Sequence, residues 1–95
     1  MSRGPGAIQR RLIEILGQHE KLLDTFELAA RAYDLDSVDA LSEAQLVAVR
    51  RGLRGLARKG AIADLGRHWR NGRQHWASVE AAARYHDRVK NIAGR

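Results

Sequence analysis

The chain has 95 residues, of which 44% are hydrophobic, and this length suits one domain because two separate cores would each bury too little surface. No stretch approaches the roughly 18 apolar residues that a membrane-spanning helix needs, and no apolar segment follows the basic start of the chain. The absence of cysteine excludes disulfides, thiol catalysis and thiolate metal sites, and it favours a cytoplasmic location.

Charge is unevenly distributed along this chain, whose formal net charge is +6. The segment from Arg50 to Arg73 contains seven arginines, one lysine and one acidic residue, so its formal charge is +7. The rest of the chain has a formal charge of −1. A surface that contacts phosphates requires such a local surplus, because each neutralised phosphate releases a counterion. The excess of arginine over lysine, fourteen to three, agrees, since the planar guanidinium suits phosphates and guanine edges.

The spacing of apolar residues predicts a first helix over residues 7–18. Four of them recur at helical intervals and form one face, namely Ile8, Leu12, Ile15 and Leu16. The residues before this helix, 1–6, are expected to form a flexible basic tail.

A second helix is predicted from Thr25 to about Tyr33. Asp24 and Glu27 have the spacing of a capping box, and a short apolar step at residues 22–23 precedes them. The following residues, 34–41, carry three aspartates and no helical stripe, so we expect a loop there.

The clearest helix start is Ser42, followed three residues later by Gln45, and it predicts a third helix over residues 43–59 that Gly60 ends. One face of this helix is apolar and carries Leu46, Val49, Leu53 and Leu56. At about 100° per residue, the opposite face carries Ala44, Val47, Ala48, Arg51, Arg54, Gly55 and Arg58. The side chains of this outer face are small near the start of the helix and positively charged further along.

Residues 62–78 are predicted to form a β-hairpin around Asn71-Gly72, because a type I′ turn needs positive φ at both central positions. A two-residue loop there would pair Arg70 with Arg73, His68 with His75, and Arg67 with Trp76. Like charges placed directly opposite each other are unfavourable, so we expect an anion at the tip of this hairpin.

The aromatic residues of the hairpin are more typical of a structural role than of a binding site. Trp69 and Trp76 would be diagonal neighbours on one face, where aromatic pairs more often stabilise a sheet than stack on bases. His68 and His75 have no adjacent carboxylate or thiolate, so they make an incomplete metal site, and we expect neither a metal nor a cofactor.

Ser78 is the expected cap of a last helix over residues 79–92, within a C-terminal segment 79–95. Its least polar stripe consists of Val79, Ala82, Ala83, His86, Val89 and Ala93. This stripe would pack on the core of the domain or on a second copy of the chain, and a homodimer through this helix is one expectation.

The expected order of elements is helix, short strand, helix, loop, helix, two-stranded hairpin, helix. It resembles the winged helix-turn-helix domains of bacterial, archaeal and phage DNA-binding regulators over residues 7–78. Residues 42–62 look like a recognition helix that ends at a glycine and runs into the first wing strand. The resemblance implies a single, mainly α domain over residues 1–95, with a three-helix core, a two-stranded wing and an extra C-terminal helix. The loop 34–41 is longer than the tight turn of that family.

The same resemblance implies that the third helix lies in the major groove and that the wing touches the backbone or the minor groove of DNA. Carried over to this sequence, it implies base-edge contacts near the helix start from Gln45, Val47, Ala48 and Arg51. Phosphate contacts would come from Arg54 and Arg58, and Arg50 is a further candidate for a DNA contact. Wing contacts would come from Arg67, His68, Arg70, Asn71, Arg73 and His75.

The leading expectation is therefore a double-stranded DNA-binding protein, a transcriptional regulator or a protein of a mobile element, associated with the nucleoid when bound to DNA. The alternative is a winged protein-interaction or assembly module that does not read DNA. RNA binding ranks third, because the only aromatic platform is the two tryptophans. We do not expect an enzyme, because no nucleophile stands beside a histidine and an acid and no glycine-rich loop could cradle a phosphate.

Overall fold

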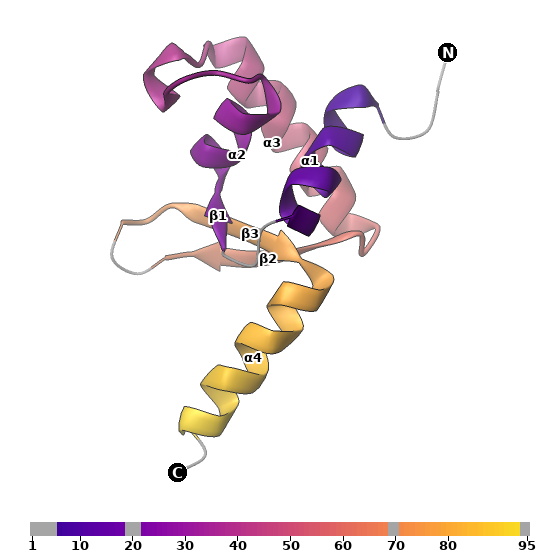
Figure 1. Cartoon of the computed structure of the whole chain (residues 1–95), viewed down its shortest axis with the longest axis vertical. Helices are drawn as coiled ribbons and strands as arrows, with labels where there is room; N and C mark the ends of the chain where they lie inside the picture. The colour runs from indigo at the N-terminus through magenta and orange to yellow at the C-terminus, as the bar shows by residue number, and fades with distance from the viewer. Residues whose placement is uncertain (1–5, 19–21, 69–70, 94–95) are drawn as a thin grey trace.

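The computed structural model describes residues 6–18, 22–68 and 71–93, the last seven of these by their backbone alone. In chain order the elements are α1 (Ala7–Gln18), β1 (Leu23–Asp24), α2 (Thr25–Ala32), the 3-10 helix η1 (Val38–Ala40), α3 (Glu43–Arg58), β2 (Ile62–Arg67), β3 (Gln74–Ser78) and α4 (Val79–Ala93). The described residues are mainly helical, with one antiparallel sheet in the strand order β1-β3-β2. The helices α1, α2 and α3 gather on one side of this sheet, and α4 projects from the other side (Figure 1).

Both predicted capping boxes are confirmed, and they determine where α2 and α3 begin. Asp24 Oδ1 accepts a hydrogen bond from the Glu27 amide at 2.8 Å, and Glu27 Oε1 accepts one from the Asp24 amide at 3.4 Å. At α3, Ser42 Oγ accepts from the Gln45 amide at 3.1 Å, and Gln45 Oε1 accepts from the Ser42 amide at 3.0 Å. Each box satisfies two amides that the helix itself leaves without partners.

The four predicted helices agree with the observed ones to within one residue at both ends. Ser78 caps α4 as expected, since its Oγ accepts a hydrogen bond from the Ala81 amide at 3.1 Å. The expected loop 34–41 contains the short helix η1. Of the expected N-terminal tail, all but Gly6 lies outside the described residues.

The predicted hairpin forms, but the predicted register is wrong. Arg67 pairs with Gln74 rather than with Trp76, and Trp76 pairs with Asp64. The amide of His68 donates to the Arg73 carbonyl at 2.9 Å, so His68 does not pair with His75. Because β2 ends at Arg67 and β3 begins at Gln74, the strands are separated by more than a two-residue Asn-Gly loop. Trp69 and Arg70 lie outside the described residues.

A bulge in β2 shifts the register further. Between the pairs Asp64–Trp76 and Arg67–Gln74, β2 has two residues, Leu65 and Gly66, where β3 has one. Gly66 has a φ of 75°, a region that glycine enters without steric cost, and its amide donates to Asp64 Oδ1 at 2.8 Å. An extra residue of this kind changes which side chains of β2 face each side of the sheet, so simple alternation could not predict where Arg67 points.

The short apolar step before α2 becomes the third strand of the sheet. In β1, Leu23 pairs with Trp76 and Asp24 pairs with His75. The predicted two-stranded wing is therefore part of a three-stranded sheet. Because β1 runs directly into α2, this pairing fixes the start of α2 beside the hairpin.

One hydrophobic core joins the helices to the sheet. Its buried members are Leu12, Ile15, Leu16, Leu23, Leu28, Ala29, Val49, Leu53, Leu56, Ile62 and Trp76. Trp76 is 4% exposed, and its Nε1 donates to the Thr25 hydroxyl, which is also buried, at 2.9 Å. A buried indole N–H needs such an acceptor, so Trp76 packs as a core residue of the sheet.

The helices α1 and α3 approach each other closely at Gly52. A Cβ atom at this position would lie 3.3 Å from Leu12 Cδ1 and 3.4 Å from Gln9 Cγ. Gln9 also donates from Nε2 to the Gly52 carbonyl at 3.3 Å. A Cβ atom on Gly55 would lie 2.9 Å from Gln9 Nε2, so Gly55 lies against α1 and its predicted place on the outer face is wrong.

The helix α4 packs on the sheet through its first turns. Ala81 and Ala82 are buried with Ala77 in a second, smaller cluster of apolar residues. The next residues, 83–86, are exposed, and the helix extends away from the rest of the molecule (Figure 1). The start of α4 thus packs on the chain's own sheet, and the homodimer expected through this helix stays a prediction.

None of the helices in the described ranges combines the length and the apolar character needed to span a bilayer.

The contact at Gly52 yields a test of the packing between α1 and α3. We expect Gly52→Leu to lower the free energy of unfolding by about 1–3 kcal/mol or more, because its side chain would overpack the contact with Leu12. Gly17→Leu is the matched control, since nothing lies within 4 Å of a Cβ atom there and leucine favours helices. Urea denaturation measures both changes. Equal stability of the two variants would contradict the close approach.

Candidate nucleic-acid interface

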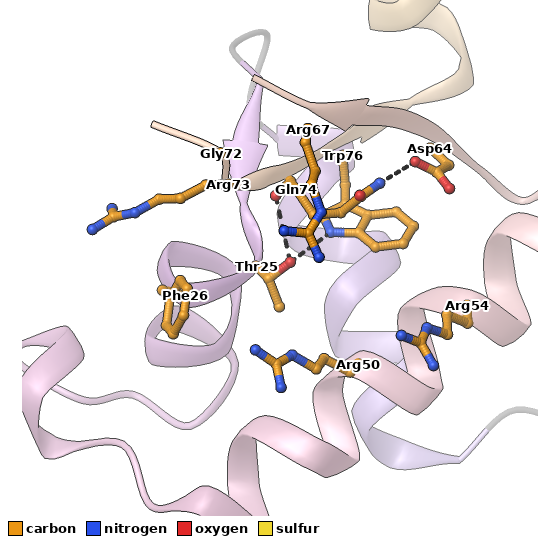
Figure 2. A pocket seen from close by; sticks show the side chains of 10 residues that line it. All are labelled: Thr25, Phe26, Arg50, Arg54, Asp64, Arg67, Gly72, Arg73, Gln74 and Trp76. Atoms are coloured by element: carbon orange, nitrogen blue, oxygen red, sulfur yellow. Dashed lines mark hydrogen bonds between the residues drawn. The ribbon is translucent and has the colours of Figure 1, made fainter. Parts of the chain in front are cut away.

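A cavity of about 460 Å³ lies between α3, the hairpin and the start of α2. Its lining consists of Thr25, Phe26, Arg50, Arg54, Asp64, Arg67, Gly72, Arg73, Gln74 and Trp76. Figure 2 shows Arg50 and Arg54 extending from α3 and Arg67 extending from the hairpin toward the same space. The two elements that carry the basic surplus therefore face each other across one cavity, which we call the arginine cavity.

Three guanidinium groups of the arginine cavity have no acidic partner in the part of the chain that the structure describes. Within the described residues, no ion pair is formed by Arg50, Arg54 or Arg67. Asp64 also lines the cavity, but its carboxylate accepts hydrogen bonds from the Gly66 amide and from the side chain of Gln74. Positive charges that share one cavity repel each other, and an anion bound between them would reduce this repulsion, so the arginine cavity favours an anion.

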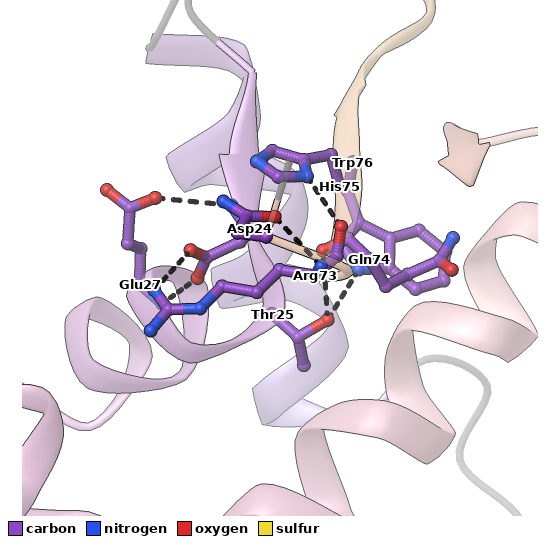
Figure 3. A network of polar contacts seen from close by, with 8 residues as sticks. Asp24, Thr25, Glu27, Arg73, Gln74, His75 and Trp76 are labelled. Carbon is purple, nitrogen blue, oxygen red and sulfur yellow. Dashed lines mark hydrogen bonds and ion pairs between the residues drawn. The ribbon is translucent and has the colours of Figure 1, made fainter. Parts of the chain in front are cut away.

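Arg73 differs from these three because it is bound to the interior. Its Nη1 donates to Asp24 Oδ2 at 3.2 Å, and Asp24 is only 3% exposed. The guanidinium carbon also lies 5.5 Å from the centroid of the Phe26 ring, within the range of a cation–π contact. Figure 3 shows the resulting polar network, in which Arg73 crosses from the hairpin to the start of α2. Arg73 thus fixes the hairpin relative to α2.

The backbone of Arg73 is held by its neighbours in the hairpin. Asn71 Oδ1 accepts from the Arg73 amide at 2.9 Å, and His75 Nδ1 donates to the Arg73 carbonyl at 2.8 Å. Because a carbonyl only accepts, this hydrogen bond requires a proton on His75 Nδ1. The ring of His68, which is exposed, has its centroid 5.6 Å from that of His75. These two predicted wing residues are thus near neighbours despite the changed register.

The remaining predicted residues of α3 fall into two groups. Arg51, Arg58 and Val47 are exposed, and none of them lines the arginine cavity. Gln45 and Ala48 are half-buried, and Gln45 Oε1 is engaged in the capping box. The base contacts expected from these residues stay predictions, and the exposed ones are better placed to make them.

The acidic loop leaves the arginine cavity open. None of the aspartates of residues 34–41 is among the residues that line it. Asp34 accepts from Arg11 Nη2 at 3.2 Å, and Arg11 Nη1 also pairs with Glu14 at 2.7 Å. This ion-pair network lies between α1 and the end of α2, so the acid nearest to α2 neutralises an arginine of α1.

Sequence reasoning missed the part that the start of α2 plays in this site. Thr25 and Phe26 line the arginine cavity, and Asp24 holds Arg73. The available signal was the apolar step at residues 22–23, which indicated a short strand, but a strand of two residues does not reveal its partner. The pairing of β1 with β3 is what brings α2 to the hairpin.

Among the described residues, no three or more histidine, aspartate and glutamate side chains form a group that could hold a metal ion.

The network around Arg73 predicts which arginine matters for stability. We expect Arg73→Gln to lower the free energy of unfolding by about 1–2 kcal/mol, between the ranges for exposed and buried pairs, because Asp24 would stay buried without its cation. Arg67→Gln is the matched control and should change stability by less than about 0.5 kcal/mol, since Arg67 has no acidic partner among the described residues. Urea denaturation distinguishes the two variants, and an equal loss in both would contradict the assignment.

The chain matches no protein-family model, no curated protein and no solved structure.

Proposed function

We propose that this chain is a double-stranded DNA-binding protein of the winged helix-turn-helix kind. In this proposal α3 lies in the major groove, and the β2–β3 hairpin is the wing that touches the backbone or the adjacent minor groove. The observation that carries the proposal is the convergence of Arg50, Arg54 and Arg67 on one cavity without an acidic partner in the described residues. Guanidinium groups arranged in this way suit the phosphate oxygens of a nucleic acid.

The order of elements supports the same proposal. Three helices precede a hairpin, and the short strand β1 joins that hairpin to make a small antiparallel sheet beside them. The helix before the hairpin, α3, is the most basic of those with described side chains, and it presents arginines both to the cavity and to solvent. An α-helix with its side chains is about 10–12 Å in diameter, and it fits the major groove of B-DNA, which is about 12 Å wide.

The geometry suggests a division of roles among the arginines. Arg50, Arg54 and Arg67 would together hold the DNA backbone where it passes between α3 and the hairpin, which sets the register of the protein on the duplex. Arg51 and Val47, exposed outside the cavity, would contact base edges, because arginine recognises guanine and an apolar side chain recognises the thymine methyl group. Arg58, also exposed, would bind a further phosphate.

Two substitutions separate these roles. We expect Arg54→Ala to weaken binding to every duplex and to reduce the slope of log K against log salt by about 1, because one phosphate contact is lost. We expect Arg51→Ala to cost about 1–3 kcal/mol on a selected site and less on random DNA, because a base contact is lost. The affinities are measured by fluorescence anisotropy over a series of salt concentrations, on random and on selected duplexes.

Arg11→Ala is the control for these measurements, because the charge of Arg11 is already paired with Glu14 and Asp34. We expect it to change the affinity less than twofold. Binding that does not depend on salt, or that survives both Arg51→Ala and Arg54→Ala, would contradict the proposal. Such a result would favour the alternative of an assembly module that does not read DNA.

A further inference from the structure

The arginine cavity holds more positive charge than a single phosphate of a DNA backbone can neutralise. Arg50, Arg54 and Arg67 line it, and none of them forms an ion pair in the part of the chain that the structure describes. A backbone phosphodiester has one negative charge and only its non-bridging oxygens accept hydrogen bonds, whereas each guanidinium presents a planar fork of donors. A compact group with several neighbouring negative charges would satisfy these forks together.

The positions of the arginines in the fold bring their charges to one place. Arg50 and Arg54 are four residues apart in α3, a spacing that puts two side chains on the same helix face. Like charges at this spacing destabilise a helix, so an anion that bridges them would also stabilise α3. Figure 2 shows Arg67 extending from the hairpin toward the space beside both side chains. The three charges thus border one space from two different elements.

The volume of the arginine cavity suits a small molecule. At about 460 Å³ it lies within the usual range of small-ligand sites, roughly 300–1,000 Å³. Its lining includes the half-buried Phe26, against which a flat ring could lie. We propose that the arginine cavity binds a small compound with a diphosphate group, either inorganic pyrophosphate or a nucleoside diphosphate. The diphosphate group would pair with Arg50, Arg54 and Arg67.

Asp64 provides a test of opposite sign, because it is the only acid among the described residues that line the arginine cavity. Its Oδ1 accepts hydrogen bonds from the Gly66 amide and from the side chain of Gln74. Asp64→Asn keeps an oxygen for both bonds and removes the negative charge. We therefore expect this variant to bind a diphosphate several-fold more tightly, whereas a variant that merely disturbed the fold would bind it more weakly.

A diphosphate and a DNA duplex would compete for the same guanidinium groups. The diphosphate therefore lowers the affinity for DNA, and DNA lowers the affinity for the diphosphate by the same factor. This competition rests on the proposed function, whereas the binding of a diphosphate does not.

Inorganic pyrophosphate is the probe for direct binding, and inorganic phosphate is the matched control, both at constant ionic strength. We expect pyrophosphate to shift the NMR signals of Phe26, the only phenylalanine of the chain. It should bind at least about tenfold more tightly than phosphate, the effect of one further charge-assisted hydrogen bond. Arg54→Gln and Arg67→Gln should each raise its dissociation constant by about tenfold. Arg58→Gln, exposed on the same helix outside the cavity, should change it less than about twofold.

ADP distinguishes the two sources of a diphosphate group. Tighter binding of ADP than of pyrophosphate, reduced to the pyrophosphate level by Phe26→Ala, would assign a nucleotide whose base lies on Phe26. An affinity for ADP no greater than that for pyrophosphate would assign the inorganic ion.

The competition is tested by measuring duplex affinity with and without saturating pyrophosphate at constant ionic strength. We expect pyrophosphate to weaken duplex binding at least about tenfold, and phosphate at the same concentration to weaken it less. Arg58→Gln should bind the duplex more weakly but keep the full response to pyrophosphate, because its side chain lies outside the cavity.

The outcomes separate the two proposals. Equal binding of pyrophosphate and phosphate, or an equal loss in Arg54→Gln and Arg58→Gln, would overturn the diphosphate site and leave duplex binding standing. Normal pyrophosphate binding with an unchanged duplex affinity would overturn the competition. A chain that binds pyrophosphate as expected but binds no duplex would refute the proposed function and leave the diphosphate site standing.

Discussion

The pairing of β1 with β3 is the contact on which the geometry of this molecule depends. It covers only two residue pairs, yet it places the start of α2 against the hairpin and brings two buried polar groups with it. Thr25 accepts the indole proton of Trp76, and Asp24 both caps α2 and accepts from Arg73. Because a buried polar group without a partner is costly, these bonds hold the hairpin at one angle to the helices. Without that angle, the arginines of α3 and those of the hairpin would not face one cavity.

The arginines of the basic segment are therefore not equivalent, although the sequence presents them as one block of positive charge. Arg73 is bound to Asp24 and positions the hairpin, whereas Arg50, Arg54 and Arg67 surround the arginine cavity with no acid to neutralise them in the described residues.

Local features were predictable from the sequence, and contacts between distant segments were less so. The helix starts followed from capping residues such as Asp24 and Ser42, whose hydrogen bonds reach only three residues along the chain. The hairpin register did not follow, because the bulge at Leu65 and Gly66 and the longer connection are compatible with the same pattern of strand-forming residues. The basic surface was predicted from the clustering of arginine, but the membership of the arginine cavity depended on that register and on the partner of β1.

The central claim is that Arg54 and Arg67, thirteen positions apart in the sequence, act on the same DNA backbone segment. A double-mutant cycle on duplex affinity, with Arg54→Ala and Arg67→Ala alone and combined, measures this most directly. If the two side chains converge as described, the combined loss will differ from the sum of the single losses by at least about 0.5 kcal/mol. Strict additivity, or no loss in either single variant, would contradict the account.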